Sequence, residues 1–175
     1  MNYGQRIALI GGNGSGKTTL FRTIQKQIQP LSGNIRLGSK VNLGLMTQEQ
    51  RFSNLEINAL ECIRSQAALS ETDARTFLHQ FLFSGDQVFT PIEKLSYGER
   101  TRLNLACLVA SGSNLLLLDE PINHLDIPSR SRFEEALNHF EGTVIVIVHD
   151  RFFIEGFANL IWEIKNKQLQ IQYLK

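Results

Sequence analysis

The sequence of 175 residues contains two cysteines, Cys62 and Cys107, and neither lies in a CxxC motif. This spacing argues against a disulfide framework and a zinc site, and it favours a reducing, cytoplasmic setting. No apolar run approaches the roughly 20 residues that a membrane-spanning helix needs, and residues 1–6 lack the apolar core of a signal peptide. We therefore expect no direct insertion into a membrane.

Neither sign of charge dominates, because 18 lysines and arginines are balanced by 17 aspartates and glutamates, for a net charge of +1. A domain that grips nucleic acid mainly by charge is normally strongly basic, so this role is disfavoured for the domain as a whole. Small basic clusters such as Arg100 with Arg102 are typical of a solvated helix face. The length and the 42% of hydrophobic residues suit one domain with its own core.

Short apolar runs alternate with segments of helical periodicity. The runs that predict strands are residues 6–10, 35–37, 41–46, 115–118, 143–148, 160–164 and 169–173. The segments that predict helices are residues 16–28, 54–82 (with Leu55 in its first helix and a second helix from Ser70), 97–110, 128–140 and 150–157. This order predicts a single α/β domain over residues 1–175, with a mostly parallel sheet flanked by helices. A small helical subdomain is expected as an insertion at about residues 50–110.

A glycine-rich segment fits the P-loop pattern GxxxxGK[ST] and stands between a predicted strand and a predicted helix. Its residues are Gly11, Gly12, Asn13, Gly14, Ser15, Gly16, Lys17 and Thr18, with Thr19 adjoining. Glycines let backbone N–H groups turn toward phosphate oxygens, and the helix N-terminus adds the positive end of its dipole. We expect Lys17 to contact the β- and γ-phosphates and Thr18 to offer its hydroxyl to Mg²⁺. The motif indicates a nucleoside triphosphate without choosing between ATP and GTP.

Two acids, Asp119 and Glu120, follow an apolar run of leucines. Carboxylates at the C-terminal end of a parallel strand face the crevice where α/β folds bind ligands. We expect Asp119 to support Mg²⁺ and Glu120 to orient or activate the water that attacks the γ-phosphate. His149 ends another apolar run, expected beside the Asp119 strand, where it can contact a γ-phosphate oxygen or that water. A charged turn and a structural histidine are the plainer alternatives, which the upstream P-loop disfavours.

Several further segments, in family order along the chain, resemble the motifs of ABC-type ATPases. They are Leu95-Ser96-Tyr97-Gly98-Glu99, similar to the signature LSGGQ or LSGGE; Gln48, similar to the Q-loop; Asn123-His124-Leu125-Asp126, similar to the D-loop; and His149, similar to the switch histidine. The amino-acid sequence of residues 119–126 and 149–153 most resembles that of the ABC-F group. Those proteins are soluble ATPases with two fused nucleotide-binding domains, and members are similar to translation factors and ribosome-protecting resistance proteins.

The resemblance implies ATP and Mg²⁺ as cofactors and a head-to-tail pair of such domains, in the same polypeptide or as a homodimer. Ser96, Gly98 and Glu99 of one domain would then bind the γ-phosphate held by the opposite P-loop, and Asp126 would communicate across the pair. The helix start that carries the signature is a ready anion site, which agrees with this role.

The resemblance also implies that the family reaction is hydrolysis of the β–γ phosphoanhydride of ATP. Glu120, His149 and Gln48 would be the catalytic residues, and Gln48 would join Thr18 and Asp119 in holding the metal. The implied setting is an ABC-F protein that acts on the ribosome.

The chain departs from the family pattern in three respects. Tyr97 replaces the commonest glycine of the signature, and Ile122 replaces a usual threonine. The chain also begins shortly before the P-loop, where family members have further strands and an aromatic residue that stacks on adenine. Tyr3 is too close to the P-loop to be that residue, so we expect a truncated domain with exposed edge strands. Adenine binding should be weak, since stacking on a base contributes about 1–3 kcal/mol.

Two other functions compete with this one. The first is a nucleotide-binding subunit of a membrane transporter, in which residues 54–82 would contact a transmembrane domain. The sequence Asn123-His124-Leu125-Asp126 argues against a transporter subunit, because transporter domains more often have Ser-Ala-Leu-Asp at these positions. The second is a degenerate nucleotide-binding module that only mediates interactions, and the presence of all the expected hydrolytic residues argues against that.

Overall fold

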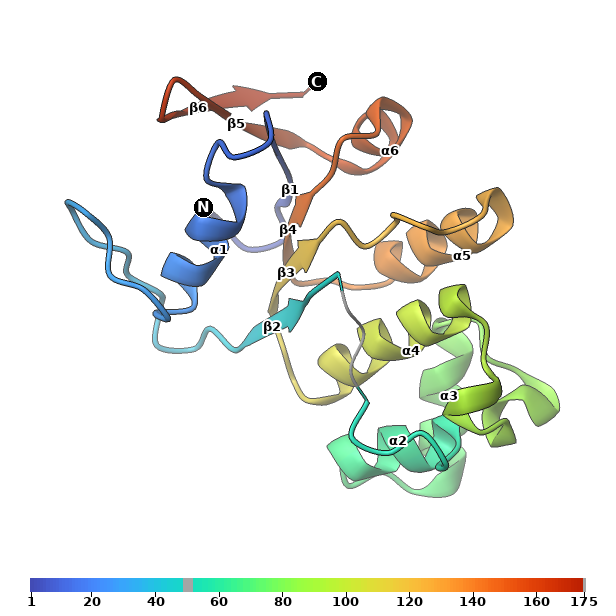
Figure 1. The fold of residues 1–175 in the computed structure, drawn as a ribbon. Helices are drawn as coiled ribbons and strands as arrows, with labels where there is room; N and C mark the ends of the chain where they lie inside the picture. The colour runs from blue at the N-terminus through green and yellow to red at the C-terminus, as the bar shows by residue number, and fades with distance from the viewer. Residues whose placement is uncertain (49–51, 175) are drawn as a thin grey trace. The chain divides into compact units, whose positions relative to one another are not determined.

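A computed structural model of the chain describes residues 1–48 and 52–174, which form two compact units (Figure 1). The first unit contains Met1–Leu45, Ser113–Pro121 and Gly142–Lys175, and the second contains Met46–Gly112 and Ile122–Glu141. The expected start of the helical subdomain, at about residue 50, lies outside the described residues. The division of residues 1–175 as a single domain stays a prediction.

A sheet whose described part has six strands forms the first unit, in the order β2-β3-β4-β1-β5-β6 (Figure 1). The strands are β1 (Arg6–Gly11), β2 (Leu43–Met46), β3 (Leu115–Asp119), β4 (Thr143–Ile147), β5 (Leu160–Lys165) and β6 (Gln168–Tyr173). The β3–β4, β4–β1 and β1–β5 pairs are parallel, and the β5–β6 pair is antiparallel. The predicted α/β class with a mostly parallel sheet is therefore confirmed.

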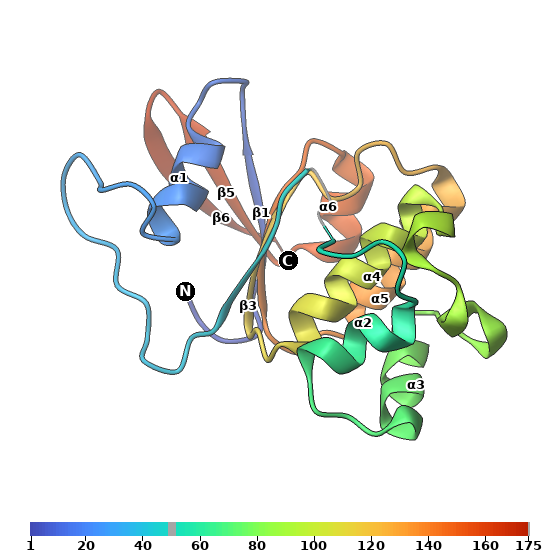
Figure 2. The same ribbon diagram turned by 60° about the horizontal axis from the view of Figure 1, so that its bottom comes forward.

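Helix α1 (Lys17–Ile24) packs on one face of this sheet, and α6 (Arg151–Phe157) lies on the other face (Figure 2). The central strands β3 and β4 are apolar without alternation because both of their faces are buried, as is usual for parallel strands. The core on the α1 face is formed by Ile7, Leu9, Phe21, Ile24, Leu115, Leu117, Ile145, Ile147 and Leu160. Burying each such side chain contributes about 1.5–3 kcal/mol to the stability of the fold. This packing holds the strands in place, and polar residues such as Asp119 lie at their C-terminal ends.

The helix α1 ends earlier than its periodicity predicts. Lys26 adopts a left-handed conformation (φ 61°), and the Gln27 N–H donates to the Arg22 carbonyl at 2.9 Å. This six-residue bond closes the helix in the manner of a Schellman motif, in which glycine is the usual left-handed residue. Since no glycine marks the position, the sequence gives no signal for the end. Ile28, expected on the buried face, is 38% exposed.

Two other sequence expectations are wrong in detail. Residues 35–37 do not form a strand in the described chain, and Ile35 is 37% exposed. Leu55 lies before the helix that was expected to include it and is 46% exposed. The predicted hairpin at the C-terminal end is confirmed. Asn166 and Lys167 both have positive φ, as the tight turn between two twisted strands requires.

The second unit is helical. Its helices are α2 (Ala59–Gln66), α3 (Glu71–Gln80), α4 (Tyr97–Ala110) and α5 (Ile127–Asn138), with short 3₁₀ helices at Gly85–Phe89 and Ile92–Lys94. Asn58 and Glu61 form a capping box at the start of α2, and the Ser70 hydroxyl accepts the Asp73 N–H at the start of α3. Among the described residues, no helix is long and apolar enough to cross a bilayer.

Arg102 is buried on α4 rather than solvated, which corrects the sequence expectation. Its side chain is 2% exposed, and Nη1 donates to the carbonyls of Phe81 and Leu82 at 3.1 and 2.9 Å. The guanidinium also lies 5.1 Å from the centre of the Phe83 ring. Burial lowers the pKa of Arg102, while the charge of Glu99 raises it. The buried cation satisfies the carbonyls that follow α3 and so ties that segment to α4.

Candidate functional site

The loop between β1 and α1 depends on glycines. Gly11, Gly14 and Gly16 have φ values of 151°, 74° and 107°, which side-chain-bearing residues rarely adopt. At Gly11 a Cβ atom would also come within 2.7 Å of Ser15 Oγ and 2.8 Å of the Ile164 carbonyl oxygen. The Ser15 N–H donates to the Gly12 carbonyl at 3.1 Å, which closes the turn. Glycine is therefore required at residue 11 both for the backbone conformation and for space.

The side chain of Lys17 lies against this loop. It is 8% exposed, and its Nζ atom donates to the carbonyls of Gly11 at 2.8 Å and Gly12 at 3.1 Å. Lys17 is also the first residue of α1, whose cap residue Gly16 has no side chain to accept the N–H groups of the first turn. The loop thus combines a held ammonium group with a helix N-terminus, and both favour an anion.

A pocket of about 300 Å³ joins this loop to the end of β3. Its lining residues are Asn13, Gly14, Gly16, Lys17, Thr18, Thr19, Asp119, Glu120 and Ile147. They meet because β1 and β3 both run parallel to the intervening β4, so that their C-terminal ends reach one edge of the sheet. Gly11, Gly12 and Ser15 do not line the pocket; they shape the loop and hold Lys17.

Asp119 and Glu120 differ in environment. Asp119 is half-buried, and burial together with the neighbouring Glu120 charge raises its pKa, against the opposing charges of Lys17 and Arg22. Glu120 adopts a left-handed conformation (φ 51°), uncommon for a residue with a side chain, and its N–H donates to the Ile147 carbonyl at 3.1 Å. A cation near Asp119 would relieve the repulsion between the two carboxylates.

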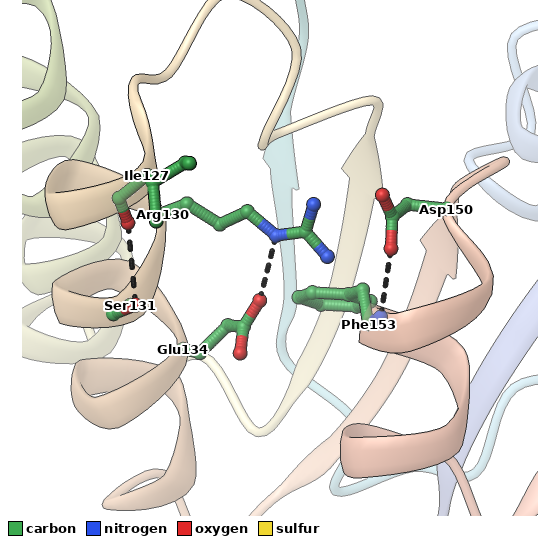
Figure 3. Close-up of polar contacts among 6 residues, drawn as sticks. All are labelled: Ile127, Arg130, Ser131, Glu134, Asp150 and Phe153. Carbon is green, nitrogen blue, oxygen red and sulfur yellow. Dashed lines mark hydrogen bonds and ion pairs between the residues drawn. The ribbon is translucent and has the colours of Figure 1, made fainter.

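His149 follows β4 and lies beside Glu120. Its Nε2 atom is 3.7 Å from Glu120 Oε1, and its side chain is 48% exposed. Figure 3 shows the next residue, Asp150, whose carboxylate accepts the Phe153 N–H at 2.9 Å and so caps α6. This cap fixes the backbone just after His149, so the histidine stands at the same sheet edge as the two acids.

The donor set of the pocket fits a triphosphate with Mg²⁺. Thr18, an exposed residue, has a hydroxyl group and Asp119 a carboxylate, and hard oxygen donors are the ligands that Mg²⁺ prefers. Within residues 1–48 and 52–174, no three His, Cys, Asp or Glu side chains form a metal cluster. Mg²⁺ usually takes one or two protein oxygens and completes its shell with phosphate and water. Among the buried side-chain nitrogen and oxygen atoms of the described residues, the Ser15 hydroxyl is one of the few without a hydrogen-bond partner.

The signature residues lie at the start of α4 in the second unit. The Ser96 hydroxyl accepts the Glu99 N–H at 3.2 Å, and the Glu99 carboxylate accepts the Ser96 N–H at 2.8 Å. Gly98 is buried, and a Cβ atom there would come within 2.5 Å of Ser129 Oγ on α5. The family resemblance predicts that Glu99 binds phosphate. In the structure its carboxylate forms a capping box and also accepts a hydrogen bond from Gln87.

The remaining predicted residues also belong to the second unit. Asp126 caps α5 by accepting the Ser129 N–H at 2.9 Å, and hydrogen bonds from Ser129 lower the pKa of Asp126. Gln48 is exposed, and its carbonyl accepts a 3.4 Å hydrogen bond from the Tyr97 hydroxyl. The Tyr97 ring packs edge-on against His124, with ring centres 6.4 Å apart. Figure 3 shows the ion pair between Arg130 and Glu134 further along α5, at 2.9 Å.

The structure therefore brings the P-loop residues together with Asp119, Glu120 and His149 in the first unit, and the predicted ligands Gln48, Ser96, Gly98, Glu99 and Asp126 belong to the second unit. Sequence reasoning missed two residues of the first unit. Ile147 lines the pocket, and its place at the end of an apolar run beside the Asp119 strand was an available signal. Arg22 lowers the pKa of Asp119, and its position four residues after Thr18 on one helix face was the corresponding signal. The role of each named residue stays a prediction.

Glu99 makes the stability of the chain depend on pH. Partial burial favours its protonated form, but hydrogen bonds from Ser96 and Gln87 and the charge of Arg102 outweigh burial and lower the pKa. The ionised carboxylate therefore stabilises the fold above about pH 4.3, and this contribution is lost as the pH falls through the lowered pKa.

We expect Glu99→Gln to lower the free energy of unfolding by about 0.5–1 kcal/mol near neutral pH, because a charge-assisted hydrogen bond becomes a neutral one. The difference from the unmodified chain should shrink at a pH below the lowered pKa of Glu99, where the protonated carboxyl group is uncharged, as glutamine is. Urea titrations at both pH values measure it. A difference that is the same at both values would contradict the assignment.

Comparison with known proteins places these motifs in context. Residues 1–123 match the family model described as ABC transporter. The Bacillus subtilis protein YdiF is 40% identical over 175 residues, which cover 99% of this chain and 27% of YdiF. The ribosome protection protein VmlR of Bacillus subtilis is 34% identical over 172 residues, covering 98% of this chain and 31% of VmlR. These relatives confirm the resemblance to the ABC-F group, and the chain spans 27–31% of their length.

A solved structure supports the fold independently. The chain matches cbiO1 from Clostridium perfringens, described as part of the ABC transporter complex cbiONQ, with a TM-score of 0.81 at 22% identity. The match covers 99% of this chain and 78% of that one. At this identity the likeness concerns the fold, and it confirms the predicted P-loop NTPase architecture.

Proposed function

Because the chain belongs to the ABC transporter family, we propose that its first unit binds Mg²⁺-ATP and hydrolyses the β–γ phosphoanhydride bond. The observation that carries this proposal is the single pocket lined by Lys17, Thr18, Asp119 and Glu120. An anion-binding loop, two oxygen donors for a metal and a second carboxylate thus face one space. Phosphoryl transfer needs little more than such positioning and charge stabilisation.

Each residue of the pocket has a defined task in this proposal. The loop N–H groups and the Lys17 ammonium bind the phosphate oxygens, and Thr18 and Asp119 hold Mg²⁺. When bound, Mg²⁺ supplies positive charge to the β- and γ-phosphate oxygens. Glu120 orients the attacking water and accepts its proton, since its carboxylate stands at the pocket wall. His149, 3.7 Å from Glu120, positions that carboxylate or the γ-phosphate.

We further propose that the second unit serves a partner domain of the same kind. The α4 N-terminus with Ser96 and Gly98 would bind the γ-phosphate held by the partner's P-loop. Asp126 would lie at the interface between the two domains. Gln48 would complete the metal shell. Support comes from the capping box, which holds the first turn of α4 in a defined conformation. ATP would then join two domains, and hydrolysis would release them.

The relative VmlR is described as a ribosome protection protein, which supports the ribosome as the target of the whole protein. The solved structures described as a transporter or as part of a transporter complex match this chain at 20–22% identity, which indicates the fold alone. We therefore propose a ribosome-directed ABC-F ATPase in preference to a transporter subunit.

The direct test is calorimetric titration of the chain with ATP in the presence of Mg²⁺, and the same titration with EDTA. We expect saturable binding that needs the metal, because Thr18 and Asp119, the proposed metal ligands, line the same pocket as Lys17. Thr18→Val keeps the side-chain shape, removes the hydroxyl and should weaken only the metal-dependent part of binding. Binding that is equal with Mg²⁺ and with EDTA would contradict the proposed metal site.

A further inference from the structure

The two cysteines of the sequence meet in the second unit. Cys62 lies on α2 and Cys107 on α4, 45 residues apart in the chain, and their sulfur atoms are 3.3 Å apart. Both are free thiols. The sequence pattern does not indicate that the two cysteines are neighbours, so this encounter is a product of the tertiary structure. The sulfurs need to approach by roughly 1 Å to reach the S–S bond length of about 2.05 Å.

A cavity reaches this pair. It has a volume of about 280 Å³, and both cysteines line it together with Ser65, Asn104 and Ser111. A water molecule occupies about 30 Å³, so the cavity admits small polar molecules such as a hydroperoxide. Cys62 is only 6% exposed, and the cavity is therefore the route by which a small oxidant can reach its sulfur.

The two thiols are not equivalent. Hydrogen bonding from Cys107 lowers the pKa of Cys62, against the opposing effect of burial. The same hydrogen bond, together with burial, raises the pKa of Cys107. The lowered pKa favours the thiolate at Cys62, which is the form that attacks an oxidant.

We propose that Cys62 and Cys107 form an oxidation site at which a hydroperoxide converts the two thiols into a disulfide linking α2 to α4. Cys62 Sγ attacks one oxygen of hydrogen peroxide, the O–O bond breaks, and a sulfenic acid and one water form. Cys107 Sγ then attacks the Cys62 sulfur, the S–O bond breaks, and the S–S bond forms as a second water leaves. Two thiols lose two electrons, and one peroxide is reduced to two waters.

The disulfide would join α2 covalently to the helix whose first turn carries Ser96 and Gly98. The proposal does not depend on nucleotide binding, since all the residues involved lie within the second unit and outside the P-loop pocket. The disulfide proposal can therefore be tested separately from the proposed ATPase activity.

The test exposes the chain to an equimolar amount of hydrogen peroxide and then alkylates the remaining thiols in denaturant. Intact-mass and peptide analysis should find a monomer that has lost two hydrogens, resists alkylation, is linked between Cys62 and Cys107, and is restored by dithiothreitol. The rate should be at least about tenfold higher for the folded chain than for the chain in urea, because folding holds the thiols together.

Single serine variants separate the two roles. Cys107→Ser should accumulate a sulfenic acid at Cys62 that dimedone traps, whereas Cys62→Ser should react at least about tenfold more slowly. Far-ultraviolet circular dichroism shows whether each variant keeps the fold. Disulfides between chains, equal rates in buffer and urea, or no reaction of the folded chain would each overturn the proposal.

Discussion

Replacing Lys17 by alanine should weaken the binding of Mg²⁺-ATP by at least about 100-fold. The change removes a cation from the wall of the pocket, and with it the charge-assisted hydrogen bonds that Lys17 would donate to the phosphate oxygens. Hydrogen bonds to charged groups contribute about 1.5–3 kcal/mol each, and 1.4 kcal/mol is a tenfold change in affinity. The loss should appear in calorimetric titration as the absence of saturable binding.

Two variants control this result. Lys40→Ala removes the same charge from an exposed position in the first unit and should leave the affinity within about twofold. Lys17→Arg keeps the charge but presents a planar fork in place of a compact ammonium, so it should bind with intermediate affinity. Thermal unfolding of each variant shows whether the loop remains folded. Unchanged affinity in a folded Lys17→Ala chain would refute the proposed anion site.

Replacing Glu120 by glutamine should slow ATP hydrolysis by about 10²–10⁴-fold while nucleotide binding is kept. Glutamine has nearly the same size and leaves the backbone bond from residue 120 to Ile147 in place, but it cannot accept a proton from water. General base catalysis contributes effects of this size. Release of inorganic phosphate measures the rate, and calorimetry measures binding in the same sample.

The Glu120→Gln variant also tests the proposed partners, which are a second nucleotide-binding domain and the ribosome. If hydrolysis releases two domains that ATP has joined, Glu120→Gln should prolong an ATP-dependent dimer, which light scattering detects. It should also increase ATP-dependent sedimentation with ribosomes and leave sedimentation with membranes unchanged. Glu155→Gln is the matched control, because Glu155 is an exposed carboxylate of the first unit in a surface ion pair with Arg151. A Glu120→Gln chain that hydrolyses ATP at the unmodified rate would exclude the proposed base.

Much of the fold follows from local sequence. The bounds of α4 match the predicted residues 97–110, and the Asn166-Lys167 turn lies where the hairpin was expected. In each case a local signal is present: a capping pair at one end of a periodic helix, or a polar turn between apolar runs. Where such a signal is missing, prediction fails. The left-handed Lys26 ends α1 without a glycine. No local signal marks residues 35–37 as a loop.

The P-loop pocket was predictable to a similar degree. The glycines and Lys17 form one continuous motif, and the rule for parallel strands brings Asp119, Glu120 and His149 to the same edge. The neighbours that adjust these groups were harder to foresee. Arg22 acts on the charge of Asp119 although the two residues belong to elements distant in sequence.

The amino-acid sequence by itself determined the chemistry that this chain carries: a phosphate-binding loop, a pair of acids after an apolar strand, and the order of motifs that identifies its family. These features are local, because adjacent residues and short-range periodicity define them. Tertiary structure alone decided that Arg102 is buried beneath the carbonyls that follow α3 and that Cys62 meets Cys107. Both outcomes depend on how helices pack, and packing joins residues whose separation along the chain leaves no trace in the sequence pattern.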